Sequence, residues 1–138
     1  MNSKIPIIKA QFSPLDLFYA AGHVTSPKNG MSFRAGLAEL LSSGAVWTLD
    51  SGIASFYQIL KALAGISGRK EVVLPAYTAG SLIVAVKKAG LKPVLCDISL
   101  NDFNSDIAGI KRALSSDTLA VVVVHMFGIP AGYTETLK

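Results

Sequence analysis

The segment Asp50-Ser51-Gly52 joins a polar turn to an apolar run with helical spacing, and these residue types at such a place can bind an anion. The first amides of a helix have no partner within the helix and lie at the positive end of its dipole, which suits a phosphate group. Gly52 would also allow a close approach of the backbone. Asp and Ser are also common as simple helix caps. The segment alone therefore favours a capped helix over a phosphate site.

Motifs of other anion-binding or nucleophilic sites do not occur in the sequence. It contains neither G-x-G-x-x-G nor a Walker A pattern, which argues against a dinucleotide site or a P-loop site. Ser51 lacks the glycine two residues before it that the G-x-S-x-G nucleophile elbow requires. The one cysteine, Cys96, has no basic neighbour to activate it. With two histidines at no ligand spacing, the sequence does not predict a zinc site.

Three further groups of residues could carry chemistry, and each follows a predicted strand. They are Pro75-Ala76-Tyr77-Thr78, Asp97, and His125-Met126-Phe127-Gly128. His125 could donate to a ligand or close a backbone hydrogen bond. Asp97 could bind a ligand, but a hydrogen bond to the following loop NDFNSD is the stronger expectation.

The elements that must position these residues alternate regularly after residue 50. Apolar residues recur every three or four positions over residues 53–64, which predicts a helix ended by Gly65 and Gly68. Strands are predicted at EVVLPAY, KPVLCDI and TLAVVVVHMFG. Helices are predicted at TAGSLIVAVKKAG, with Thr78 as cap and Gly90 as stop, and at SDIAGIKRALSS.

The strand segments 72–74 and 121–124 are almost continuously apolar, which is typical of strands buried on both faces of a parallel sheet. The predicted fold class is therefore α/β, three-layer, with a mainly parallel sheet and right-handed crossovers. Ligands of such sheets bind beyond the carboxyl ends of the strands. The candidate residues above would meet at that edge.

The N-terminal part of the sequence shows less order. Residues 1–31 have no sustained period and contain several Pro and Gly residues, so we expect an irregular N-terminal arm with a short helix over 15–21. The domain would then occupy residues 32–138. Within it, Ser32 is predicted to cap a helix that ends at Gly44, and AVWTLD is predicted to be a strand.

The composition narrows the function classes. Hydrophobic residues make up 51% and charged residues 16%, below the roughly 25% charged residues of an ordinary soluble domain. Apolar faces that further protein covers would explain this low charged fraction. The net charge of +4 is scattered, which argues against nucleic acid as a partner. No signal peptide and no apolar run long enough for a membrane helix is recognisable, so we expect a cytoplasmic protein with no membrane partner.

Three motifs, taken in order, resemble the N-terminal part of the DegT/DnrJ/EryC1/StrS family. They are SGIASFYQILKAL, EVVLPAYTAGSLIVAVKKAGLKPVLCDI and LAVVVVHMFGIPAG, within residues 32–132. This family consists of aminotransferases of sugar-nucleotide metabolism that depend on pyridoxal 5′-phosphate (PLP). The resemblance implies a partial large domain of the aspartate-aminotransferase architecture (fold type I) over residues 32–138.

The resemblance also assigns cofactor-binding residues. The family binds the PLP phosphate through the last two amides of an S-G-T-A segment, which here are those of Ile53 and Ala54, following Gly52. Ile53 replaces the threonine of that motif and its hydroxyl. The aromatic residue that stacks on the pyridine ring falls at Ala79, which cannot stack, and Tyr77 is the candidate substitute. His125 begins the H-x-F/Y-G-x-P turn that lines the cofactor side of the sheet.

Two parts of the family's site are not matched in this sequence. In the family, an aspartate on the next strand pairs with the pyridinium nitrogen, and a later lysine forms the Schiff base with PLP. Lys138 has no strand before it and does not match that lysine. We therefore expect the chain to supply the phosphate site without the Schiff-base lysine, and to be inactive on its own. The resemblance implies a homodimer, with nucleotide-sugar and amino-donor substrates for the full enzyme.

Two alternatives remain open from the sequence. The first is a non-catalytic binding module for a phosphorylated small molecule or a partner chain. The second is an α/β domain of unrelated function, such as a receiver-like or generic nucleotide fold. A receiver would need an acidic cluster at its strand ends, where only Asp50 and Asp97 stand.

Overall fold

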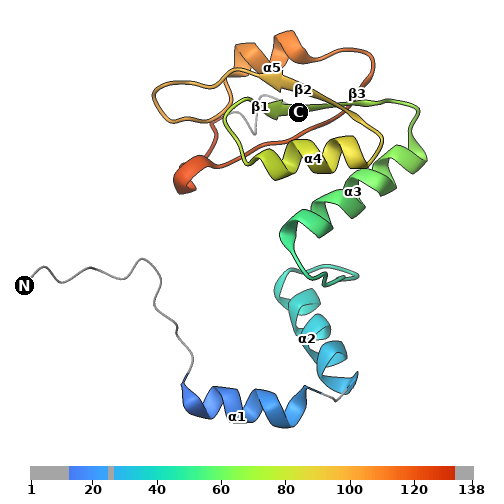
Figure 1. Ribbon diagram of the computed structural model, residues 1–138, viewed down its shortest axis with the longest axis vertical. Helices are drawn as coiled ribbons and strands as arrows, with labels where there is room; N and C mark the ends of the chain where they lie inside the picture. Colours follow the sequence, from blue (N-terminus) through green and yellow to red (C-terminus); the bar gives the residue numbers. More distant parts are fainter. Residues whose placement is uncertain (1–12, 25–26, 133–138) are drawn as a thin grey trace, which may run out of the picture. The chain divides into compact units, whose positions relative to one another are not determined.

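The computed structural model describes residues 13–24 and 27–132 (Figure 1). The chain divides into two compact units, Met1–Thr48 and Leu49–Lys138. Each unit is described by itself below, as the first unit and the second unit.

The second unit is built on a parallel three-stranded sheet. Its order is β2 (Lys92–Cys96), β1 (Glu71–Pro75) and β3 (Thr118–Val121), with β1 in the centre. β1 pairs with β2 in unbroken register over all five residues. Its pairing with β3 shifts register between Glu71 and Val72. Successive strands are joined by α4 (Gly80–Lys88) and α5 (Ile107–Ala113), which are the predicted crossover helices.

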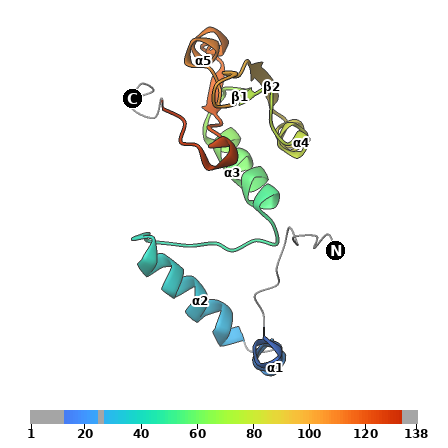
Figure 2. The same cartoon turned by 90° about the vertical axis from the view of Figure 1, so that its left-hand side faces the viewer.

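Helices cover both faces of this sheet. α4 and α5 lie on opposite faces (Figure 1 and Figure 2), and α3 (Gly52–Ile66) packs against α4. Together with the parallel strands, these helices confirm the prediction of a three-layer α/β fold.

The alternation of side chains along β1 explains why both faces need a cover. Val72 and Leu74 point to one face and pack with residues of α3 and α4, among them Leu60 and Val86. Val73 points to the other face and packs in a second cluster with Ile110 of α5 and Cys96. The three β1 side chains are fully buried, so one short strand holds both halves of the core together.

Several predicted boundaries in the second unit are wrong. α3 continues through Gly65 to Ile66. α4 starts after Ala79, and Thr78 does not cap it. The strand predicted over TLAVVVVHMFG ends at Val121, and the side chains at 121–124 are only half-buried because β3 is the edge strand among the described residues. Gly90 ends α4 as predicted, with a positive φ of 80°.

The first unit contains two helices, α1 (Pro14–His23) and α2 (Pro27–Leu40). α1 includes the short helix expected over 15–21. Ser13 and Asp16 begin it with a capping box, in which the Asp16 carboxylate accepts from the Ser13 amide at 2.7 Å. These hydrogen bonds from Ser13 lower the pKa of Asp16.

Two further expectations, the helix from Ser32 to Gly44 and the strand AVWTLD, are wrong. Ser32 lies inside α2, so it is not a cap, and α2 ends at Leu40 before Gly44 is reached. AVWTLD forms no strand, and Trp47 within it is 77% exposed. The predicted boundary at residue 31 is not tested by this division into units, which lies at Thr48. Whether residues 1–31 act as a separate arm stays a prediction, and residues 1–12 lie outside the described part.

No helix within the described residues is long and apolar enough to cross a membrane. In the same part of the chain, His, Cys, Asp and Glu residues form no group of three or more that could hold a metal ion.

In the second unit, the ion pair between Glu71 and Lys92 joins the first residues of β1 and β2. It should make the stability of the second unit depend on pH. The Glu71 carboxylate accepts from Lys92 Nζ at 2.8 Å and from Ser115 Oγ at 2.6 Å. The Lys92 bond, followed by the Ser115 bond, lowers the pKa of Glu71 below its usual 4.5. The Glu71 partner raises the pKa of Lys92 above its usual 10.5.

Glu71→Gln should therefore lower the free energy of unfolding at pH 7, and this loss should shrink as the pH falls through the folded pKa of Glu71. The reason is that a carboxyl group with a lowered pKa stabilises the fold fully above its unfolded pKa and loses this effect as the pH falls through its folded pKa. Urea unfolding at pH 7 and at pH 3 measures the change. Glu39→Gln is the control, since Glu39 has no ion pair among the described residues. Equal losses at both pH values would contradict the prediction.

Candidate functional site

The start of α3 has both of the properties that the sequence left open, a cap and unpaired amides. Ser51 is the N-cap, with an extended backbone (φ −157°, ψ 158°), and its hydroxyl oxygen accepts from the Ala54 amide at 3.3 Å. The Ser55 amide donates to the Ser51 carbonyl at 3.0 Å. Within the described residues, the amides of Gly52 and Ile53 have no acceptor. The two open donors are thus Gly52 and Ile53, while Ala54 is engaged by the cap.

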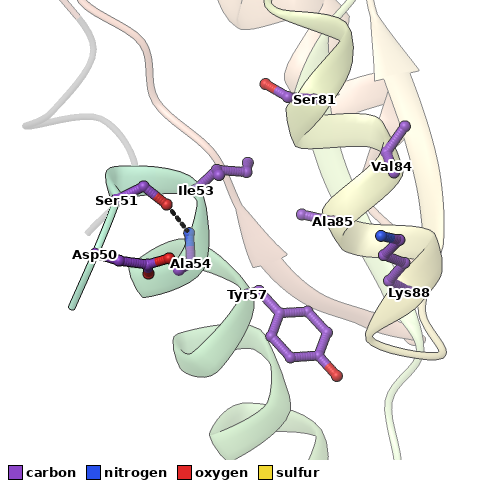
Figure 3. Close-up of a pocket in the computed structure, with 9 residues that line it drawn as sticks. All are labelled: Asp50, Ser51, Ile53, Ala54, Tyr57, Ser81, Val84, Ala85 and Lys88. Carbon is purple, nitrogen blue, oxygen red and sulfur yellow. Dashed lines mark hydrogen bonds between the residues drawn. The ribbon is translucent and has the colours of Figure 1, made fainter.

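A cavity of about 670 Å³ lies beside this helix start, between α3 and α4 (Figure 3). Ser51 and Ile53 stand at its α3 side, and Ser81 and Lys88 stand across from them on α4. The remaining lining residues are Asp50, Ala54, Tyr57, Val84 and Ala85. Lys88 makes no ion pair among the described residues. Open amides and an ammonium group can attract an anion, while the single carboxylate of Asp50 opposes it.

A second, smaller cavity of about 270 Å³ lies where β1 leads into α4. Its lining residues are Tyr77, Thr78, Ala79 and Met126. Tyr77 is 52% exposed, and the centre of its ring lies 6.1 Å from that of Phe103. This cavity brings together the segment after β1 and the turn that follows β3.

Two strained turns carry the aromatic rings at this edge. Phe103 (φ 60°) and Phe127 (φ 53°) both have left-handed backbone conformations, which cost a non-glycine residue roughly 1–2 kcal/mol. Their rings meet edge to face at 5.8 Å. Such strain persists only where the surroundings determine the conformation, and it is frequent at functional sites.

A buried amide determines the turn after β3. Asn104 is 2% exposed. Its Oδ1 accepts from the Met126 amide at 2.9 Å, and its Nδ2 donates to the Ile129 carbonyl at 3.2 Å and to the Asp102 carboxylate at 3.1 Å. The Asn104 side chain, followed by Ser99, lowers the pKa of Asp102.

His125 takes the structural role that the sequence left open. Its Nδ1 accepts from the Ala131 amide at 3.0 Å. A nitrogen that accepts carries no proton, so the neutral ring has its proton on Nε2. That N–H is a donor with which His125 can still meet a ligand. Asp97 is hydrogen-bonded to the loop NDFNSD through its backbone, because its carbonyl accepts from the Asp106 amide at 3.0 Å. Its side chain accepts from the next amide, that of Ile98.

The predicted site residues therefore all lie in the second unit, but they do not line one common cavity. Ile53 and Ala54 line the larger cavity, and Gly52 stands beside it as the first residue of α3. Tyr77 and Ala79 line the smaller cavity. His125 lines neither cavity, but the next residue, Met126, lines the smaller one.

Sequence reasoning missed the loop that holds this edge together. Phe103 and Asn104 lie in the segment NDFNSD, for which the sequence predicts only a bond with Asp97. Clusters of Asn, Asp and Ser do indicate tight turns. The burial of Asn104 arises from partners 22 and 25 residues away, and no local pattern reports such contacts.

Comparison with known proteins identifies the family. Residues 9–137 match the DegT/DnrJ/EryC1/StrS aminotransferase family. The chain belongs to this family.

Individual proteins are similar to the chain in sequence. Protein MosB of Rhizobium meliloti is 32% identical over 106 residues, which cover 77% of this chain and 21% of that protein. UDP-N-acetyl-3-dehydro-alpha-D-glucosamine 3-aminotransferase of Acidithiobacillus ferrooxidans is 29% identical over 140 residues, covering 94% of this chain and 38% of the relative. The chain thus spans less than half the length of these two relatives.

A solved structure shows the same fold. The PLP form of the putative sugar aminotransferase Spr1654 from Streptococcus pneumoniae superimposes with a TM-score of 0.84 at 21% identity. The match covers 98% of this chain and 36% of that structure. The parallel sheet and its covering helices therefore have the fold of the matching part of that structure, which is a fold type I architecture.

The role of Ser51 as a cap in this DegT/DnrJ/EryC1/StrS family chain can be measured directly. Ser51→Ala should lower the free energy of unfolding by about 1 kcal/mol, because it removes the acceptor of the Ala54 amide. Urea unfolding followed by circular dichroism gives the value. Ser81→Ala is the control, since the exposed Ser81 side chain makes no hydrogen bond among the described residues. A Ser51→Ala variant as stable as this control would contradict the assignment.

Proposed function

We propose that this chain supplies the phosphate site and one wall of the ring site for PLP in an aminotransferase that acts on a nucleotide-linked keto sugar. The observation that carries the proposal is the pair of open amides, those of Gly52 and Ile53, at the start of a helix in a chain of the DegT/DnrJ/EryC1/StrS family. The activity for which the Acidithiobacillus relative is named, on a UDP-linked dehydro sugar, supports the substrate class.

The residues at the start of α3 fit a phosphate group. The amides of Gly52 and Ile53 need acceptors, and the first turn of α3 contains no acidic residue. The Asp50 carboxylate beside it opposes the anion, and Lys88 across the cavity offsets this charge. A methyl group at Gly52 would meet no atom within 4 Å. This open space is where an anion would approach the backbone. The Ala54 amide can join the other two only by giving up its long bond to Ser51 Oγ.

The smaller cavity fits a flat ring. Tyr77 supplies an aromatic face that Ala79 cannot supply, and Met126 supplies a polarisable thioether. His125, directly before Met126, has a further donor in its Nε2 proton, which has no acceptor among the described residues. When bound, PLP acts as an electron sink for a carbanion at the substrate carbon. The residues described here would bind and orient the cofactor.

The Schiff-base lysine, the substrates and the oligomeric state complete the proposal. The chain spans 21% and 38% of the two relatives, so the Schiff-base lysine, the amino donor and the sugar specificity concern the whole enzyme. We propose a homodimer, and exposed apolar side chains such as Leu95 (52%) and Leu100 (85%) support association.

Two glycines of α3 offer a matched test of the phosphate site. Gly52→Ala should weaken the binding of pyridoxamine 5′-phosphate about tenfold, because the new methyl group occupies the approach to the open amides. Gly65→Ala is the control, since Gly65 lies in the same helix near its other end and a methyl group there also meets no atom within 4 Å. Fluorescence titration of the cofactor measures both affinities, and competition with inorganic phosphate tests the anion site.

The outcomes separate the proposal from the alternatives. The proposal is supported if the chain binds the cofactor tightly, if phosphate displaces the cofactor, and if Gly52→Ala weakens its binding. Equal binding by the Gly52→Ala and Gly65→Ala variants would overturn the placement of the phosphate. A site that takes inorganic phosphate as tightly as the cofactor would instead favour a binding module for phosphorylated molecules.

A further inference from the structure

We propose that Asn104 is a positioning residue that sets the shape of the smaller cavity, acting through Met126 and the turn 126–129. The inference rests on the proposed function, because it takes this cavity to hold the ring of the cofactor. Asn104 itself is buried and does not line the cavity.

The first step is the way in which Asn104 holds the turn. Its side chain accepts from the amide of Met126, where the turn begins, and donates to the carbonyl of Ile129, where the turn ends. Both ends are thus tied to one planar amide. Between them lie Phe127 and Gly128, at φ values of 53° and 79°. A turn with two successive left-handed residues needs such fixed ends to keep a single conformation.

The second step is that the turn forms a wall of the cavity. Met126 donates its amide to Asn104 and lines the cavity with its neighbours Tyr77, Thr78 and Ala79. A shift of the Met126 backbone would therefore change the distance between this wall and the segment after β1.

The third step connects Asn104 with the opposite wall. Phe103, directly before Asn104, has a left-handed backbone and places its ring 6.1 Å from Tyr77 and 5.8 Å from Phe127. The loop is itself closed by the Ser99 amide, which donates to the Asn104 carbonyl at 2.8 Å. Both walls of the cavity thus depend on the loop in which Asn104 is the buried polar centre.

The neighbouring residue provides a matched control. Ser105 is also buried, at 5% exposure, and its hydroxyl has no hydrogen-bond partner among the described residues. Removal of that hydroxyl leaves no group unpaired, whereas removal of the Asn104 amide leaves three groups without their partner.

The experiment compares Asn104→Ala with Ser105→Ala in the whole chain, with pyridoxamine 5′-phosphate and inorganic phosphate as probes. Asn104→Ala should weaken cofactor binding by about tenfold and leave phosphate binding unchanged, because the amides of Gly52 and Ile53 do not contact Asn104. Ser105→Ala should leave both affinities unchanged. The ratio of the two affinities is a readout that a loss of stability alone would not move.

The results distinguish this inference from the proposed function. If the unmodified chain binds neither probe, the proposed function falls and this inference falls with it. If it binds both, and Asn104→Ala changes both affinities equally or neither, only the role of Asn104 is overturned. Asn104→Ser serves as the second variant where Asn104→Ala does not fold. Its shorter side chain cannot bridge Met126 and Ile129, so the same change in the affinity ratio is expected.

Discussion

Burial of β1 on both faces is the constraint on which the rest of the second unit depends. Val72, Val73 and Leu74 alternate between the two faces, and all three are excluded from water. A central strand of this kind is stable only when helices cover both sides, which requires crossover connections and a parallel sheet. The carboxyl ends of all strands then lie at one edge. Tyr77, Asp97 and His125 follow these strand ends, whereas Gly52, Ile53 and Ala54 come after a segment that forms no strand.

A second constraint operates at that edge, where the chain must turn tightly without regular backbone pairing. Asn104 fixes the turn after β3, because its buried amide side chain forms hydrogen bonds with three groups. Phe103, next to Asn104, and Phe127, within the turn, have left-handed backbone conformations. The hydrogen bonds and the ring contacts offset the backbone strain, and the rings are held beside the smaller cavity.

The start of α3 shows how one feature serves stability and binding together. Ser51 satisfies the third amide of the helix, and the first two remain open. A fully capped helix would offer nothing to an anion, and an uncapped one would fray. The partial cap leaves donors available on an element that the core holds in place through Leu60.

Much of this protein followed from the sequence because the deciding interactions are local or periodic. The apolar run 72–74 indicated a strand buried on both sides, and the spacing of apolar residues over 53–64 indicated α3. Ser51 was recognisable as a cap, since a cap bonds within three residues. The order of three motifs was enough for the family. The strand predicted at AVWTLD failed because β-propensity needs a neighbouring strand to pair with, and the described residues provide none there.

Only the tertiary structure decided the features that depend on distant residues. The partners of Asn104 lie 22 and 25 residues away, and those of Phe103 come from two other segments. His125 could be a ligand or a structural group until the Ala131 amide was placed on its Nδ1. Hydrogen-bond partners and strained turns of this kind exist only after the chain has folded. The sequence alone therefore determined the layers and the edge of the site, and the fold decided which side chains hold that edge in shape.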